Sequence, residues 1–471
     1  MFYCLKDNYL LRGWDKLPTG IVKRMSGEVY FLDPDLYAKI CDFGWMIFEE
    51  SPFLTKEQQQ FMAQLAEHGL VDLCEKPRPL SEEQAYRRYP NRYLRAVHWA
   101  VTGQCNCHCR HCYMSAPSGN SGDYSQEECM DIIDQMESAG VQAVSLTGGE
   151  ALVRRDFLEI AERLTRAGIR IDTIMSNGIL VDEALLKALA GMGQTPEFNM
   201  SFDGIGCHDW LRGTEGAERR VIRAFELCAE HGFPTGAEYC LHKGNTDAFR
   251  ESVKLLGSLG CRSLKVNGLS LEGEALQIKD YILTSDEEFS FYLDYIPKYY
   301  EDGQPLRLML SGMFMSKGKD KAVIPFEKMQ EDQDCGNYCL CGHARNRMYI
   351  TQDGYIVPCI PIGSVENGRN QFPNIRETTL SEALNDSFYM SFIDTRLDTY
   401  FQIHPECEAC EYRNRCAGGC RGRASGDGDL MAKDAEACAF FRDGWYDKVK
   451  KLIEKEEKND LNKRSNAKDR Q

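Results

Sequence analysis

The middle of the chain alternates short apolar runs with amphipathic stretches, which is the pattern of repeated βα units. The predicted strands cover residues 96–102, 143–146, 171–175, 198–202, 236–241 and 264–269, and the predicted helices cover 126–139, 156–167, 182–189, 217–230, 247–259 and 286–300. Six units in series predict an α/β fold with a parallel sheet and right-handed crossovers. Because a full barrel has eight units, six favour an open, partial (β/α)6 barrel with its chemistry at the carboxyl ends of the strands.

Cap residues support these bounds. Ser125 and Glu128 have the spacing of a capping box at the start of the first helix. Gly140, Gly168 and Gly260 follow three of the helices, where a C-terminal cap is expected.

A separate unit precedes the βα series. Residues 9–22 and 27–32 have the pattern of two strands around a turn, and residues 34–41 and 56–68 have helical periodicity. A connector rich in Pro and Arg follows. We therefore expect a small winged-helix-like α+β domain over residues 1–88.

Composition narrows the class of protein. The 471 residues carry a net charge of −16, which disfavours a general nucleic-acid binder, because such a protein needs a basic face. No stretch approaches the roughly 18 apolar residues of a membrane span, and the first residues lack the features of a signal peptide. We expect a cytoplasmic enzyme, in which the 21 Cys bind metal or carry out redox chemistry rather than form disulfides. Residues 446–471 form a charged tail, expected to be helical from Trp445 and disordered from Glu454.

Three cysteines directly follow the first predicted strand. Cys105, Cys109 and Cys112 have x3 and x2 spacing, so that three thiolates on one loop can hold three irons of a cubane cluster and leave the fourth without a protein ligand. A zinc loop or buried free thiols are the alternatives. Cys107 falls outside the spacing and is expected to be a buried thiol.

Polar motifs follow the next three strands. Gly148 and Gly149 let the backbone approach a ligand closely, and an Arg such as Arg212 can grip a carboxylate with two hydrogen bonds. A simple turn and a surface Arg are the structural alternatives. The candidate residues at these strand ends are Gly148, Gly149, Glu150, Ser176, Asn177, Ser201 and Arg212.

The C-terminal region has a second cysteine pattern. Cys341 is followed by Gly354 and Cys359, and the pattern continues with Cys407, Cys410, Cys416, Cys420 and Cys438. Zinc ribbons also use C-x2-C pairs, but a zinc site would leave cysteines unused, whereas two four-ligand clusters use eight.

Together these motifs resemble the radical S-adenosylmethionine (SAM) superfamily with a C-terminal SPASM domain. The resemblance implies a radical SAM partial barrel over 95–303, a bridging segment over 304–334 and a SPASM domain over 335–445. It implies that SAM binds the open iron, with Gly148, Gly149 and Glu150 near its amino group, Ser201 at its ribose and Arg212 at its carboxylate. His111 takes the position that usually stacks on adenine, a role that Tyr113 can share, and Ser176 and Asn177 belong to the same pocket.

The same resemblance assigns the remaining cysteines to auxiliary clusters, which gives three [4Fe–4S] clusters in all. Cys407, Cys410, Cys416 and Cys438 are expected to hold auxiliary cluster II, and Cys341, Cys359 and Cys420 auxiliary cluster I. Cys335 is the expected fourth ligand of cluster I. Cys339, or an open iron, is the alternative.

Enzymes of this kind largely modify peptides and proteins. Residues 1–88 resemble the PqqD-like domain that binds a leader peptide as an added strand, although a structural cap is the alternative. The resemblance implies a maturase of ribosomal precursor peptides that forms a thioether cross-link and takes electrons from a flavodoxin or ferredoxin. Ile360 stands where sulfatase maturases have an Asp, which counts against formylglycine formation. A haem or quinone maturation enzyme, a C–C cross-linking enzyme or epimerase, and a non-catalytic iron–sulfur scaffold are the rivals. The sequence indicates no catalytic side chain.

Overall fold

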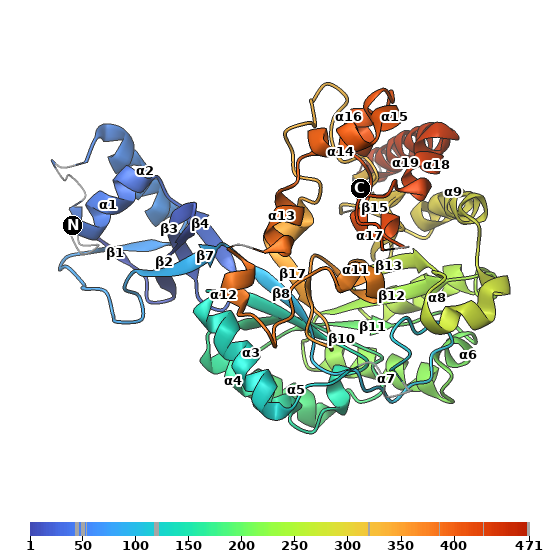
Figure 1. The fold of residues 1–471 in the computed structure, drawn as a ribbon, viewed down its shortest axis with the longest axis horizontal. Coiled ribbons are helices and arrows are strands. Elements are labelled where there is room, and N and C mark those ends of the chain that lie inside the picture. The colour runs from blue at the N-terminus through green and yellow to red at the C-terminus, as the bar shows by residue number, and fades with distance from the viewer. Residues whose placement is uncertain are drawn as a thin grey trace.

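The computed structural model describes residues 1–42, 47–48, 52, 54–116, 122–318, 321–385, 387–426 and 428–468. An N-terminal α+β unit lies at the left of Figure 1, beside a large sheet with helices below it and a helical C-terminal part above it. Within the described ranges, no helix is both long and apolar enough to span a membrane.

The large sheet contains all six predicted strands as parallel neighbours in chain order, which confirms the α/β fold. These strands are β8 (Ala96–Ala100), β9 (Ala143–Thr147), β10 (Arg170–Ser176), β11 (Glu197–Ser201), β12 (Thr235–Leu241) and β13 (Ser263–Gly268). The crossover helices are α3 (Gln126–Ser138), α4 (Phe157–Arg166), α5 (Glu183–Gly191), α7 (Ala217–Glu230), α8 (Phe249–Ser258) and α9 (Ser285–Glu301).

The predicted caps are present. The Ser125 side chain and the Glu128 side chain form the capping box of α3. Gly140, Gly168 and Gly260 follow α3, α4 and α8 with φ values of 72°, 72° and 80°, a left-handed conformation that costs glycine little.

Both edges of the sheet are extended by segments outside the βα series. On one side β14 (Arg307–Leu310) pairs parallel with β13 and is followed by β15 (Phe314–Ser316) and β16 (Ala322–Val323). On the other side β17 (Arg347–Ile350) pairs parallel with β8, and β18 (Ile356–Val357) forms the edge. The C-terminal cysteine region therefore supplies part of the sheet that carries the first cysteine loop.

The two faces of the sheet differ in burial. Phe198, Met200, Ala237, Tyr239, Leu264 and Val266 are buried in the core on the helical side. The alternating residues Asn199 and Glu238 are half-buried and Lys265 is exposed. Parallel sheets are normally covered on both faces. This sheet instead has half-buried and exposed polar residues on the face opposite these helices, which we call the chamber face. The C-terminal part lies above the sheet in Figure 1.

The N-terminal unit has two small sheets, in the orders β4-β3-β2-β7 and β5-β1-β6. Its elements are β1 (Phe2–Leu5), β2 (Tyr9–Asp15), β3 (Leu17–Lys23), β4 (Glu28–Phe31), α1 (Pro34–Asp42), β5 (Ile47–Phe48), α2 (Lys56–Glu67), β6 (Val71–Cys74) and β7 (Arg87–Arg92). The stretch predicted as one strand over 9–22 divides in two, because Lys16 takes φ 65° and reverses the chain. Trp14 Nε1 and Asn91 Nδ2 donate to the Ala139 carbonyl at 3.4 and 3.0 Å and attach the unit to the end of α3.

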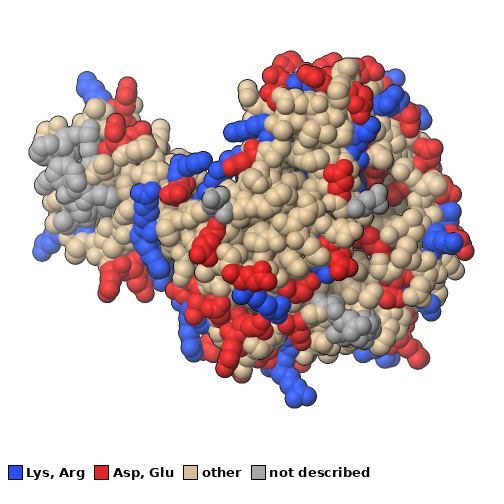
Figure 2. Space-filling view, viewed as in Figure 1, with Lys and Arg blue, Asp and Glu red and all other residues tan. Residues whose placement is uncertain are grey.

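Short helices make up most of the C-terminal part. They are α10 (Ile360–Ser364), α11 (Glu366–Arg369), α12 (Leu380–Ala383), α13 (Phe388–Asp394), α14 (Leu397–Ile403), α15 (Pro405–Glu408), α16 (Arg413–Cys416), α17 (Arg421–Ala424) and α18 (Ala435–Arg442). Figure 2 shows acidic side chains gathered near α3 and α12, where Glu127, Glu128, Asp131, Glu377 and Glu382 line a surface groove.

The tail differs from its prediction. Helix α19 (Trp445–Lys468) extends to Lys468 within the stretch expected to be disordered from Glu454, and residues 469–471 of that stretch lie outside the described residues. Val449 and Ile453 are buried on one side of this helix, which packs on α9. The Glu457 carboxylate accepts a hydrogen bond from the Ala322 N–H at 2.7 Å. The composition of the tail is polar, but tertiary contacts stabilise it as a helix.

Candidate functional site

The first cysteine loop lies at the carboxyl end of β8 and is held by the end of α6 (His208–Arg212). The N–H groups of His108 and Arg110 donate to the Arg212 and Leu211 carbonyls at 3.2 and 2.9 Å. Gly213 has φ 60°, and a Cβ there would lie 2.2 Å from the His108 carbonyl oxygen. Only glycine permits this close approach, so α6 positions the loop backbone.

The glycine pair after β9 packs against the start of the same loop. Gly149 N–H donates to the Thr102 carbonyl at 2.9 Å, and Glu150 N–H donates to the Gln104 carbonyl at 2.8 Å. A Cβ on Gly148 would lie 2.3 Å from the Thr102 oxygen. The two glycines therefore bring two strand ends together, beside the pocket predicted for the SAM amino group.

The Glu150 side chain organises the ends of β9 and β10. Its buried carboxylate accepts hydrogen bonds from Ser176 Oγ at 3.0 Å and Asn177 N–H at 2.7 Å. Asn177 Nδ2 in turn donates to Asn106 Oδ1 at 2.7 Å, within the cysteine loop. Desolvation raises the pKa of Glu150 to about 7. Three predicted cofactor residues thus belong to one network that reaches the loop.

Arg212 has a protein carboxylate partner. Its Nε lies 2.7 Å from Asp203 Oδ2 and its Nη2 lies 3.2 Å from Oδ1, while Nη1 faces the Cys109 sulfur at 3.8 Å. A hydrogen bond from Cys107 and the charge of Arg212 outweigh burial and lower the pKa of Cys109 to about 6. Asp203 was missed by sequence reasoning, although it lies within the motif that supplied Ser201.

The two other predicted SAM contacts make fewer protein contacts. His111 Nδ1 is buried without a hydrogen-bond partner in the described structure, and desolvation lowers the pKa of this residue to about 3, so its ring is neutral. Ser201 ends β11 on the chamber face and is half-buried. Cys107 is buried, as expected, between Cys105 and Cys109.

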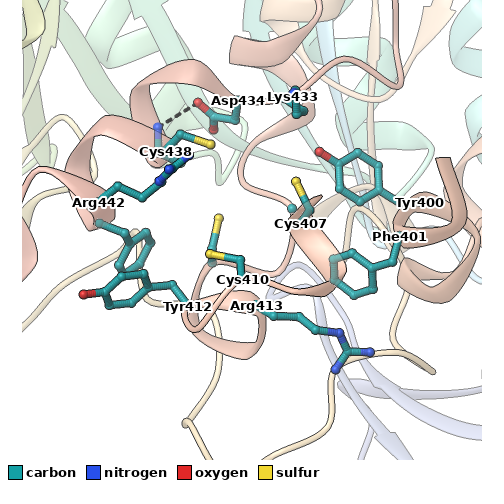
Figure 3. A pocket seen from close by; sticks show the side chains of 14 residues that line it. Tyr400, Phe401, Cys407, Cys410, Tyr412, Arg413, Lys433, Asp434, Cys438 and Arg442 are labelled. Atoms are coloured by element: carbon teal, nitrogen blue, oxygen red, sulfur yellow. Dashed lines mark hydrogen bonds between the residues drawn. The ribbon is translucent and has the colours of Figure 1, made fainter. Parts of the chain in front are cut away.

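Four of the C-terminal cysteines line one cavity. They are Cys407, Cys410, Cys416 and Cys438, which come from α15, α16, α18 and the segments beside them (Figure 3). Tyr400 and Phe401 are apolar parts of its wall, and Asp434 accepts the N–H groups of Cys420 and Ala437 at 2.7 and 3.0 Å. Because the Asp434 carboxylate already accepts these N–H groups, the four thiols are the donors left for a metal, and four thiols fit an iron–sulfur cluster.

A second group of cysteines lies near α10 and α17. Cys341, Cys359 and Cys420 lie near one another. Burial and the nearby Cys420 thiolate raise the pKa of Cys341, and burial and the nearby Cys420 and Cys341 thiolates raise that of Cys359 to about 12. The two candidates for the fourth ligand lie in different surroundings. Cys335 is buried with its sulfur 3.8 Å from the Arg413 carbonyl. Cys339 accepts from Arg345 and from Arg396, the latter at 3.5 Å.

The arrangement of these thiols suits clusters of several irons better than one ion. Across the part of the chain that the structure describes, no three His, Cys, Asp or Glu side chains are close enough to hold a single metal ion. A cubane separates its ligands, because each thiolate binds a different iron.

The structure also brings together polar residues that the sequence did not indicate, and it adds a contact for Tyr113, which the sequence did indicate. On the chamber face, Asn199 Nδ2 donates to Glu238 Oε1 at 3.2 Å, and Lys265 Nζ lies 3.7 Å from the same oxygen. Tyr113, directly after Cys112, hydrogen bonds through its side chain to Tyr349 of β17. Alternation along three strands was the available signal, but only the register shows that these residues share a face.

Comparison with known proteins agrees with this geometry. Residues 99–256 match the family model of the Radical SAM superfamily, and residues 339–411 match that of the iron–sulfur cluster-binding SPASM domain. The chain therefore contains a radical SAM domain and a SPASM domain. It is a radical SAM enzyme, as the cysteine spacing predicted.

Similar proteins carry out more than one reaction. The chain is 26% identical to the AdoMet-dependent heme synthase of Methanosarcina barkeri over 74% of this chain and 97% of that one. It is 24% identical to the PqqA peptide cyclase of Granulibacter bethesdensis over 72% of this chain and 86% of that one. Streptococcus suis SuiB bound to S-adenosylmethionine has the same fold, with a TM-score of 0.58 and 16% identity over 92% of this chain and 99% of that one.

Proposed function

We propose that this enzyme modifies a ribosomally made precursor peptide, forming a thioether cross-link of the sactipeptide or ranthipeptide type. When bound, SAM and its cluster supply a 5′-deoxyadenosyl radical that removes a hydrogen atom from the substrate. A peptide cyclase among the relatives supports a peptide substrate. So does the fold of SuiB, which has been solved bound to its precursor peptide SuiA.

The proposal of a peptide substrate rests on the free edge of β4. This strand ends the sheet β4-β3-β2-β7, and in the described structure no strand pairs with its outer side. The Leu32 N–H donates inward to the Thr19 carbonyl, and backbone groups alternate in direction along a strand. The N–H groups of Val29 and Phe31 therefore point outward. An exposed edge of this kind accepts a peptide as an added strand, which is the expected role of a PqqD-like domain over residues 1–88.

The residues of the chain have separate proposed tasks. Three [4Fe–4S] clusters are held by the cysteine loop, by the four-cysteine cavity, and by Cys341, Cys359 and Cys420 with Cys335 as fourth ligand. Asp203 orients Arg212, and Glu150 orients Ser176 and Asn177. The fold thus supplies placement of SAM and of the substrate, while the cofactor supplies the radical. We place the enzyme in the cytoplasm, where a flavodoxin or ferredoxin reduces it.

The test removes residues 1–88 and offers a leader-bearing precursor encoded beside the gene. We expect the truncated enzyme to cleave SAM without peptide at the full rate and to modify the precursor much more slowly. The same precursor without its leader is the control, since both enzymes should modify it equally slowly. Equal turnover of the full precursor by both enzymes would contradict the proposal.

A small-molecule maturase is the second candidate. The heme synthase of M. barkeri is 26% identical over most of this chain, which favours a tetrapyrrole substrate. Such an enzyme needs no leader. Substrate consumption that is unaffected by loss of residues 1–88 would favour this candidate.

A further inference from the structure

The chamber face gathers positive charge in a chain whose net charge is −16. His98 lies on β8 and Arg347 on β17, where the register pairs Arg347 with Ala96 and Tyr349 with His98. Since side chains alternate along a strand, Arg347 and His98 point to the same face. Lys265 shares this face from β13, five strands away from β8 in sheet order.

Curvature of the sheet brings these groups within electrostatic reach of one another. Burial, and then the charges of Arg347, His343 and Lys265, lower the pKa of His98 to about 4. His343 belongs to η4 (His343–Arg345), the turn that leads into β17. Basic groups from β8, η4, β17 and β13 therefore converge, although their elements are far apart in sequence.

Carboxylates are few in this group. Lys265 has Glu238 at 3.7 Å. Among the described residues, no carboxylate lies within ion-pair distance of Arg347, His98 or His343. His98 Nδ1 is buried and has no hydrogen-bond partner in the described structure. At neutral pH His98 is uncharged, so the positive charges here are those of Arg347 and Lys265, and only Lys265 has a carboxylate partner. A charge without a counter-ion and a buried polar atom without a partner both cost free energy.

The group remains accessible. Lys265 and His343 are exposed, while His98 and Arg347 are half-buried. Tyr349, which the register pairs with His98, hydrogen bonds through its side chain to Tyr113, directly after Cys112. The basic group thus shares the chamber with the end of the cysteine loop.

We infer that Arg347 and Lys265, with the neutral His98 beside them, form an anion-binding subsite that takes a carboxylate of the substrate. The inference rests on the proposed function, because the anionic groups of an unmodified peptide are carboxylates. Arg347 offers the planar fork that binds a carboxylate with two hydrogen bonds, and Lys265 offers a point charge. The carboxylate comes from an Asp or Glu side chain or from the end of the peptide.

The basic surface continues toward the N-terminal unit. Burial raises the pKa of Tyr93 to about 12. The charges of Arg95 and Arg347, which lie near the hydroxyl, oppose this rise. A Cβ on Gly27, in the turn between β3 and β4, would lie 3.9 Å from Arg95 Nε. A peptide held at β4 therefore meets a basic path into the subsite.

The test uses equilibrium dialysis to measure how tightly the anaerobically reconstituted holoenzyme binds three radiolabelled probes. N-acetylglutamate N-methylamide carries a side-chain carboxylate, N-acetylglycine carries a chain-end carboxylate, and N-acetylglutamine N-methylamide is neutral. We expect at least one carboxylate probe to bind and the neutral probe not to bind. The better of the two carboxylate probes identifies the source of the carboxylate.

The variant Lys265→Gln with Arg347→Gln should weaken carboxylate binding about tenfold or more. Its matched control, Arg166→Gln with Lys187→Gln on the outer helices α4 and α5, removes the same charge and should bind as the wild type does. Lys265→Arg with Arg347→Lys keeps the charge and should retain most binding. Urea unfolding of each variant separates a lost subsite from a lost fold.

Three results would overturn the inference. They are no carboxylate binding by the wild type, equal binding of the neutral probe, and unchanged binding in the Gln double variant. Binding of coproporphyrin that disappears in the same variant would assign the subsite to a tetrapyrrole instead. If carboxylate binding follows the variants but removal of residues 1–88 leaves precursor turnover unchanged, the subsite stands and the leader-dependent function fails.

Discussion

Arg212 and Asp203 form a two-point ion pair beside the cysteine loop, with Nε 2.7 Å from one carboxylate oxygen and Nη2 3.2 Å from the other. The Asp203 side chain is fully buried and that of Arg212 is 12% exposed. Since the same guanidinium faces Cys109 through Nη1 at 3.8 Å, Asp203 determines where its charge lies. The pair therefore couples the end of β11 to the first cysteine loop.

Asp203→Asn should destabilise the protein by about 3–5 kcal/mol, because it leaves the buried charge of Arg212 without its partner. Urea unfolding of the protein without cofactors measures this change. Adding Arg212→Gln should recover part of the stability, since the unpaired charge is then removed. SAM cleavage should be low in both variants. A double variant less stable than Asp203→Asn would contradict the ion-pair explanation.

The raised pKa of Glu150 predicts that the free energy of unfolding depends on pH. Burial raises its pKa from 4.5 to about 7 in the folded protein. A carboxyl whose folded pKa is raised contributes stability that is fully present below pH 4.5 and is lost as the pH rises through about 7. The difference is on the order of 3 kcal/mol. Glu150→Gln should therefore reduce the fall in unfolding free energy between pH 5 and pH 8, measured by urea unfolding of the cofactor-free protein. An unchanged pH slope would show that Glu150 ionises normally.

Iron content tests the cluster assignments. With three [4Fe–4S] clusters, the reconstituted protein should contain about 12 iron atoms per chain. Replacing Cys105, Cys109 and Cys112 together by Ala should remove about one third and abolish SAM cleavage. Replacing the four cysteines of the cavity in Figure 3 should remove another third. Iron that is unchanged in the first variant would refute the three-cysteine site.

Cys335 and Cys339 give a paired prediction. We expect Cys335 to be the fourth ligand of cluster I, because it lies six residues before Cys341 and the five residues between them allow a loop between two irons, whereas Cys339 is only two residues away. Cys335→Ala should alter the spectra of cluster I and lower activity, and Cys339→Ala should be nearly silent. The opposite ranking transfers the ligand role to Cys339. If neither change has an effect, an iron open to a substrate thiolate becomes the better interpretation.

A proline at position 29 tests whether the leader peptide binds at the edge of β4. Val29→Pro removes an N–H that points away from β3, so it deletes no hydrogen bond of the existing sheet. Binding of a fluorescent leader peptide should fall by about tenfold or more, while SAM cleavage without peptide is unchanged. Val29→Ala is the control for loss of the side chain. A proline variant that binds the leader like the alanine variant would place the leader elsewhere.

The βα series was predictable because its signals are local. Each strand is a short apolar run, and the first helix begins at the capping box of Ser125 and Glu128. The cysteine motifs were equally readable, since their spacing along the chain is itself the chemical signal. Short-range spacing therefore determined the class of enzyme.

Long-range pairing was not predictable in the same way. β17 joins β8 across some 250 residues of sequence, and nothing in either segment specifies its partner. The tail from Glu454 has the composition of a disordered segment, but it stays helical because Ile453 is buried and Glu457 binds the backbone of Ala322.

By itself the sequence determined the parallel sheet, the cysteine groups and the residues beside the first loop, because these depend on periodicity and spacing. Only the tertiary structure decided that Asp203 holds Arg212, that β17 pairs with β8, and that His98, Lys265 and Arg347 share a face. Each of these depends on the register and curvature of a sheet, which are set by contacts between residues far apart in the chain.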